Sequence, residues 1–154
     1  MVCVTTFLFV RHAMTTAGSG DTGLSPEGRD LARDVGRALR SRKATYVYSS
    51  PLRRARETTD EIALTLGLEL MVDERLRERT NWGDVPGETF DEFLARWDTA
   101  DVAGSRARLA AFVADVSTRY PRATVVAVAH GGIVGDLLGG HERWPHCGVT
   151  ELVV

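Results

Sequence analysis

Two short apolar segments that each end at a histidine constrain this chain more than any other feature of its sequence. The first, residues 4–10, is almost entirely apolar and is followed by Arg11 and His12. The second, residues 124–129, runs into His130 and two glycines. Continuous apolar runs of this length are typical of strands that are covered on both faces. A histidine directly after such a strand would lie at the carboxyl edge of a sheet, where open α/β folds bind ligands.

Strands and helices alternate along the rest of the chain. Further strands are predicted over residues 45–48, 69–72 and 149–154. Helices are predicted from Pro26, from Pro51 to a stop at Gly67, and over residues 88–97, 105–120 and 133–138. Residues 74–87 contain two glycines and a proline and are predicted to be irregular. The alternation predicts an α/β fold, a three-layer α/β/α sandwich with a mainly parallel central sheet, and the length predicts a single domain over residues 1–154.

Inward-facing residues can be predicted from the helical period. The first helix is expected to bury Leu31, Val35, Ala38 and Leu39. The second is expected to turn Ala55, Ile62 and Leu66 inward, and the helix over 105–120 to turn Leu109, Phe112, Val113 and Val116 inward. Trp97 is expected in the core, whereas Trp82 and Trp144 could be pocket walls or surface anchors.

Composition excludes several classes of function. The formal net charge is only −2, so neither nucleic acid nor a membrane surface is an expected partner. No apolar stretch is long enough to span a bilayer, and the N-terminal run lacks the basic start and cleavage site of a signal peptide. Cys3 and Cys147 are too few for a disulfide scaffold, so a cytoplasmic location is expected.

Four segments carry a family resemblance when they are taken in order: residues 11–15, 49–55, 76–79 and 130–132. Together they resemble the histidine phosphatase superfamily, also called phosphoglycerate-mutase-like, over nearly the whole chain. The resemblance implies that His12 is a nucleophile that forms a covalent phosphohistidine, and that Arg11 and Arg54 bind phosphate. It also implies that His130 is the second histidine of the site, and that Glu78 protonates the leaving group.

The chemistry of phosphate supports these roles independently. A phosphate monoester carries about two negative charges at neutral pH, so a neutral imidazole can attack it only in an electropositive site. Two arginines and a protonated His130 could supply that field, with guanidinium groups matching phosphate oxygens in pairs. We therefore expect a metal-independent phosphatase that uses no cofactor and takes a small phosphorylated substrate. The four histidines show no metal-ligand spacing.

Several other residues leave alternatives open. Thr15 could offer its hydroxyl or its backbone N–H to phosphate, or simply cap its loop. Glu78 lies in a charge-rich run, and Asp84 is a second candidate for the proton donor. Arg53, at the variable position beside Arg54, is expected to be solvated. The adjacent pair His146-Cys147 is not expected to be a nucleophilic site, because neighbours in sequence do not face each other.

The chain departs from the family pattern at several positions, and one departure bears on which activity is expected. Ala13 replaces the usual glycine after the histidine, and an asparagine often found a few residues later is absent, with Ala17 and Gly18 in that stretch. The segment between Glu78 and Ser105 is short, which favours a phosphatase with an open pocket. The alternatives are a phosphoglycerate-type mutase and a non-catalytic domain that binds phosphorylated ligands. Neither the physiological substrate nor the oligomeric state follows from the sequence.

Overall fold

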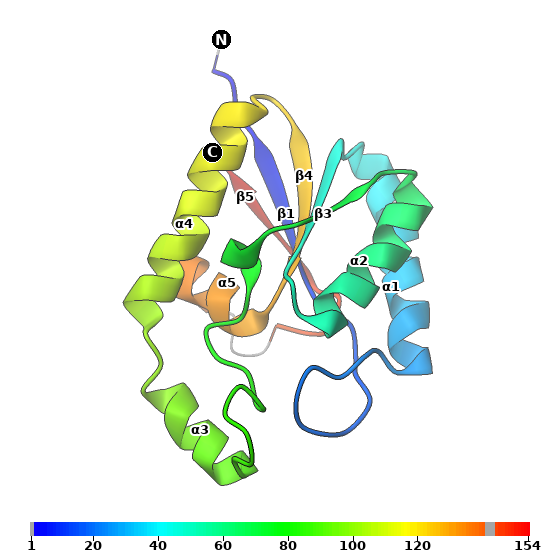
Figure 1. Cartoon of the computed structure of the whole chain (residues 1–154). Helices are drawn as coiled ribbons and strands as arrows, with labels where there is room; N and C mark the ends of the chain where they lie inside the picture. The colour runs from blue at the N-terminus through cyan, green and yellow to red at the C-terminus, as the bar shows by residue number, and fades with distance from the viewer. Residues whose placement is uncertain (1, 141–143) are drawn as a thin grey trace.

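A five-stranded sheet forms the centre of the computed structural model, which describes residues 2–140 and 144–154 (Figure 1). The strands are β1 (Thr6–Arg11), β2 (Tyr46–Ser49), β3 (Leu70–Val72), β4 (Thr124–Ala129) and β5 (Val149–Val153). Their order across the sheet is β3-β2-β4-β1-β5. Neighbours pair in parallel except β5, which runs antiparallel to β1. The predicted α/β fold with a mainly parallel sheet is thus confirmed.

Helices cover both faces of this sheet. On one side lie α1 (Pro26–Leu39) and α2 (Arg53–Leu66), and on the other lie α4 (Val102–Arg119) and α5 (Gly131–Leu138) (Figure 1). Successive residues of a strand point to opposite faces, so β1 contributes to two separate cores. Phe7 and Phe9 pack with the α4 and α5 side, and Leu8 and Val10 pack with the α1 and α2 side. This is why the strand is apolar without alternation.

Some predicted helix boundaries are wrong. The second helix begins at Arg53 and not at Pro51, because Leu52 is still extended and its N–H is accepted by Ser50 Oγ at 3.3 Å. The helix predicted over 88–97 is α3 (Phe90–Asp98), which Thr89 caps. Helix α4 begins at Val102, three residues before the predicted start at Ser105, and Asp101 caps it. Two short 3₁₀ turns, Arg40–Arg42 and Glu74–Leu76, were not predicted.

The inner face of α1 differs from the prediction. Its buried residues are Gly28, Ala32, Gly36 and Leu39, whereas Ala38 is exposed. The reason is close helix packing, because a Cβ on Gly36 would lie only 3.0 Å from the Thr65 side chain of α2. The four inward residues predicted for α4 are all buried, as expected.

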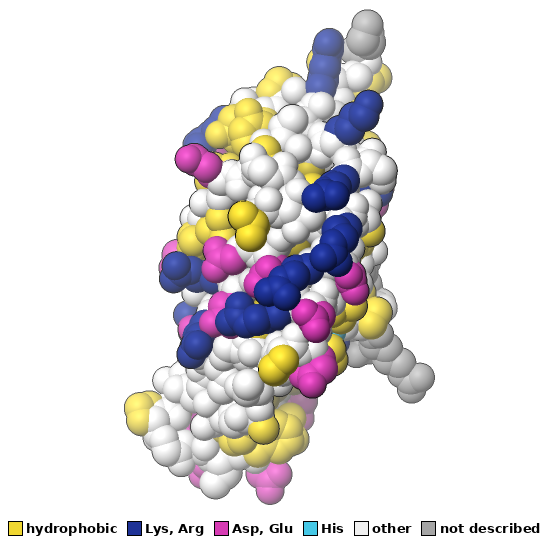
Figure 2. Space-filling view, turned by 90° about the vertical axis from the view of Figure 1, so that its right-hand side faces the viewer, with side chains coloured by type: hydrophobic (Ala, Val, Ile, Leu, Met, Phe, Trp, Pro, Cys, Tyr) yellow, Lys and Arg dark blue, Asp and Glu magenta, His cyan; other side chains and the backbone are white. Residues whose placement is uncertain are grey.

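Charged side chains on the outer faces of α1 and α2 are interleaved by sign (Figure 2). Arg29 contacts Glu57 at 2.9 Å, and Arg33 contacts Glu61 at the same distance, so ion pairs join the two helices. Among the described residues, none of the helices has the length and apolar character needed to cross a membrane.

Candidate active site

The carboxyl ends of β1 and β4 bring the two histidines together. These strands are adjacent and parallel, and Arg11 is paired in register with Ala129, so His12 and His130 leave the sheet side by side. Their ring centroids are 5.3 Å apart. Strand β2 is the other neighbour of β4, so the start of α2 places Arg54 at the same edge. The sheet topology therefore gathers three residues that are far apart in the sequence.

His12 presents an unprotonated nitrogen to the site. Its Nδ1 donates to the carbonyl oxygen of Ala13 at 2.9 Å, which leaves Nε2 as the acceptor. Arg54 Nε donates to that Nε2 at 3.3 Å. Burial, and then the charge of Arg54, lowers the pKa of His12 to about 3. At neutral pH the Nε2 lone pair is thus available for nucleophilic attack.

His130 is fully buried and differs in its hydrogen bonding. Its Nε2 lies 2.7 Å from Ser50 Oγ. Ser50 Oγ also accepts the Leu52 N–H; if its own proton is donated to Nε2, the His130 hydrogen lies on Nδ1. That Nδ1 has no partner among the described residues. Burial, and then the charge of Arg54, lowers the pKa of His130 well below its ordinary value; this shift favours the neutral ring, whereas a protonated one was expected from the sequence.

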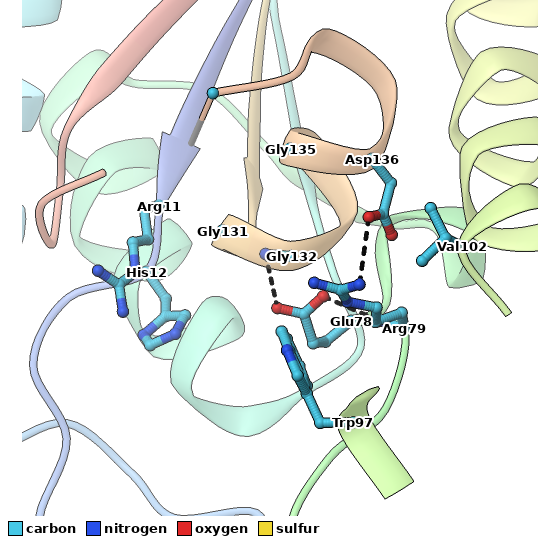
Figure 3. Close-up of a pocket in the computed structure, with 11 residues that line it drawn as sticks. Arg11, His12, Glu78, Arg79, Trp97, Val102, Gly131, Gly132, Gly135 and Asp136 are labelled. Atoms are coloured by element: carbon cyan, nitrogen blue, oxygen red, sulfur yellow. Dashed lines mark hydrogen bonds and ion pairs between the residues drawn. The ribbon is translucent and has the colours of Figure 1, made fainter. Parts of the chain in front are cut away.

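Glu78 is held against the first turn of α5. Its carboxyl oxygens accept the N–H of Gly132 at 3.1 Å (Figure 3) and the N–H of Ile133 at 2.8 Å. A Cβ on Gly132 would lie 2.5 Å from Glu78 Oε1, so the second glycine after His130 makes room for this carboxyl group. Burial raises the pKa of Glu78, although the backbone hydrogen bonds oppose that shift. A buried carboxyl with a raised pKa is suited to donate a proton.

Asp84, the other candidate donor, lies elsewhere. It is exposed, its Oδ1 accepts from Arg77 Nη2 at 2.8 Å, and its Oδ2 accepts the Asn81 N–H. It does not line either of the two cavities that His12 lines. Its contacts brace the loop, and of the two carboxyl groups it is Glu78 that lines both cavities at His12.

Two cavities meet at His12 and Glu78. The larger, of about 500 Å³, is also lined by Arg11, Arg79 and Asp136 (Figure 3). The smaller, of about 200 Å³, is also lined by Thr15, Arg54, Asn81 and Trp82. Trp97 lines both, so its prediction as a core residue is wrong: α3 carries it to the cavity wall. A reacting group at His12 therefore has space on two sides.

Some of the remaining predicted residues line a cavity at His12 and others do not. Arg11 lines the larger cavity while its guanidinium donates to the Trp144 carbonyl, and Thr15 lines the smaller cavity. Arg53 is exposed and paired with Glu57 at 2.8 Å, as expected for a solvated residue. Trp82 is a cavity wall, one of the two alternatives left open for it. Trp144 is buried and lines neither cavity at His12, so both alternatives for it are wrong.

Three supporting residues were missed. Thr58 Oγ1 accepts the Ala13 N–H at 2.9 Å, and Asn81 Oδ1 accepts from Arg54 Nη1 at 2.8 Å. His146 Nδ1 donates to the His12 carbonyl at 3.0 Å, with the two rings 5.4 Å apart. The sequence signalled only His146, as a neighbour of Cys147, and burial raises the pKa of that thiol to about 11. The family often has an asparagine a few residues after the first histidine, and this chain lacks it. Asn81 brings an amide to Arg54 from a different segment.

Within residues 2–140 and 144–154, no three His, Cys, Asp or Glu side chains are grouped so as to hold a metal ion. Beside His12 lie the Arg54 guanidinium, which donates to it, and the His130 ring. Such a site can hold an oxyanion, attack it with a neutral imidazole, and protonate a group that leaves on the Glu78 side.

Comparison with known proteins agrees with this geometry. A model of the histidine phosphatase superfamily (branch 1) matches residues 7–150. The glucosyl-3-phosphoglycerate phosphatase of Mycobacterium tuberculosis is 32% identical, over 90% of this chain and 75% of that protein. Phosphoglycerate mutase-like protein 4 of Arabidopsis thaliana is 30% identical, over 83% of this chain and 67% of that protein. The structure of a mycobacterial glucosyl-3-phosphoglycerate phosphatase in complex with VO3 superposes with a TM-score of 0.77 at 27% identity, covering 96% and 92% of the two chains.

Proposed function

The chain belongs to the histidine phosphatase superfamily, and we propose that it hydrolyses phosphate monoesters, or phosphohistidine, through a covalent phosphohistidine on His12. Relatives named as phosphatases support phosphatase activity in general. The observation that carries the finer proposal is the state of His12. Its Nε2 is unprotonated, buried, and in contact with the Arg54 guanidinium, which is one of the donors proposed to hold the phosphate.

In the first step, the phosphate oxygens take the donors that the free site leaves available. We assign these donors to Arg11, Arg54, the His130 Nδ1–H and Thr15. The phosphate displaces the Arg54 contact from His12, and Nε2 attacks phosphorus in line. A P–N bond forms as the ester P–O bond breaks, and Glu78 gives its proton to the departing oxygen.

In the second step, water attacks the phosphohistidine. Glu78, now a carboxylate, accepts a proton from that water, the P–N bond breaks, and inorganic phosphate leaves. The cycle returns every group to its starting state without a metal or a cofactor. Since the acid is beside the cavity of about 500 Å³, both the leaving group and the later water have access to it.

Hydrolysis of an aryl phosphate in excess chelator tests this proposal directly. The parent protein is expected to keep its full rate with chelator, and His12→Ala is expected to lose at least about 10³-fold in kcat. Radiolabelled substrate followed by quenching in base should leave acid-labile label on the parent and none on the variant. A rate that collapses with chelator, or a variant that keeps its label, would contradict the mechanism.

Transfer to water and not back to an organic acceptor separates the phosphatase from the mutase alternative. A mutase must exclude water from its site, and the short segment between Glu78 and Ser105 favours hydrolysis because it offers little chain to close over the phosphate. Release of inorganic phosphate should therefore equal substrate consumed, even with phosphoglycerate present as an acceptor. Labelled phosphoglycerate as the main product would favour the mutase.

A further inference from the structure

The loop that precedes β5 holds the chain on both sides of the point where β1 ends. The Arg11 N–H donates to the Gly148 carbonyl at 3.1 Å, and the Arg11 carbonyl accepts the Cys147 N–H at 2.9 Å. The next carbonyl along the chain is that of the proposed nucleophile, His12. It is bonded by a side chain of the same loop, because His146 Nδ1 donates to it at 3.0 Å. His146 thus continues, past the end of the strand, the pairing that the main chain of the loop begins.

The other end of the same peptide group is held by helix α2. The Ala13 N–H donates to Thr58 Oγ1 at 2.9 Å. Thr58 is fully buried, and its own hydroxyl donates to the Arg54 carbonyl at 2.7 Å, so it cannot turn away easily. A peptide group is planar, so holding its oxygen and its nitrogen fixes its orientation. The peptide between His12 and Ala13 is therefore clamped by side chains from two different elements.

This clamp bears on the direction of the nucleophilic ring. The His12 Nδ1 donates to the Ala13 carbonyl at 2.9 Å, and this bond turns Nε2 toward the site. The ring of His146 also lies beside the ring of His12, with the two centroids 5.4 Å apart. An in-line attack depends on where the attacking atom points, and a displacement of about 1 Å can cost a hundredfold in rate. A group that fixes the main chain of His12 therefore affects the chemical step.

His146 itself is not placed to touch the substrate. It lines neither of the two cavities at His12, and its side chain is half-buried. Burial lowers the pKa of His146, which favours the neutral ring, so its contribution is a hydrogen bond and not a charge that attracts phosphate. We propose that His146 is a positioning residue, whose Nδ1–H holds the peptide after His12 so that Nε2 is directed at phosphorus. This inference rests on the proposed phosphohistidine mechanism.

Two variants of similar shape, His146→Asn and His146→Leu, test the proposal. Both lose the ring, but the Asn amide can donate from nearly the place of Nδ1, whereas Leu has no donor. The measurement is the rate at which a saturating aryl phosphate forms the phosphoenzyme, followed as the first burst of aryl alcohol. His146→Leu should slow this step by about tenfold to a hundredfold, and His146→Asn should stay within about threefold of the parent. Competitive inhibition by inorganic phosphate should change by less than about twofold in both variants, because the proposed phosphate donors are unchanged.

Cys147→Ala is the matched control within the same loop, since Cys147 is buried and its main-chain bond to Arg11 survives the substitution. It should keep the parental rate within about twofold. A loop that had merely loosened would also release the Arg11 guanidinium from the Trp144 carbonyl and weaken inhibition by phosphate. The role of His146 is overturned if Asn and Leu give the same rate, if Cys147→Ala is as slow as His146→Leu, or if weaker phosphate inhibition accounts for the loss. A parent that forms no phosphoenzyme overturns the proposed function itself.

Discussion

The two halves of the candidate site are built in different ways. The phosphate side stands on the ends of β1, β2 and β4, where His12, Arg54 and His130 follow buried strands. The leaving-group side is built from residues 77–89 and the short helix α3, which lies apart from the layers of the sandwich (Figure 1). The rigid half can be shared by enzymes with many substrates, whereas the irregular half can vary without disturbing the sheet.

The first way to test this comparison is at the strand ends, where the largest effect is expected. Arg54→Lys keeps the charge but loses the fork that reaches both His12 Nε2 and Asn81 Oδ1. It should lower kcat/KM for an aryl phosphate by about 10²- to 10³-fold. Arg53→Lys is the control, since that neighbour is exposed and should change the rate by less than about twofold. Equal losses in the two variants would mean that the start of α2 in general, and not the Arg54 guanidinium, determines the rate.

The second test addresses the buried part of the leaving-group side. Glu78→Gln should slow hydrolysis of an alkyl phosphate by about 10²-fold, and slow an aryl phosphate less, because a good leaving group needs less protonation. Asp84→Asn should leave both rates nearly unchanged. The reverse result would move the proton donor to Asp84.

The pH profile follows from the same assignments. The acid must be protonated, so activity falls as pH rises through the pKa of Glu78, and burial places that limb above the range of an ordinary glutamate. The nucleophile must be unprotonated, and the pKa of His12 of about 3 keeps it so far to the acid side. The acidic limb of the profile therefore reflects the second ionisation of the phosphate ester, at about pH 6. Glu78→Gln should abolish the basic limb and leave the acidic one.

The strand-end half of the site could be predicted from the sequence, whereas on the leaving-group side only Glu78 was given a role in advance, through the family resemblance. Apolar strands followed by histidines are local signals, and the rule that ligands bind at the carboxyl edge then brings His12 and His130 together. Trp97 carried no comparable signal, because a tryptophan at a helical inner position is typical of a core. Asn81 and His146 act through loops whose course depends on tertiary contacts, so their roles are not encoded in any local pattern.

The third test, with the smallest expected effect, concerns a contact between two loops beside the smaller cavity. The Gly20 N–H donates to the Trp82 carbonyl at 2.8 Å, and a Cβ on Gly83 would lie 2.6 Å from Gly20 Cα. Gly83→Ala should therefore push the loops apart and raise KM by roughly threefold to tenfold, with little change in kcat.

Gly87→Ala is its matched control, because Gly87 also has a positive φ, of 76° against 102° for Gly83, but a Cβ there meets nothing within 4 Å. Both variants should lose about 1 kcal/mol of stability from backbone strain, measured as the free energy of unfolding in urea. The difference in KM between them then isolates the loop contact. If the two variants have the same KM, the contact between the two loops does not contribute to substrate binding. The leaving-group side would then be less constrained by its own contacts than the strand ends are.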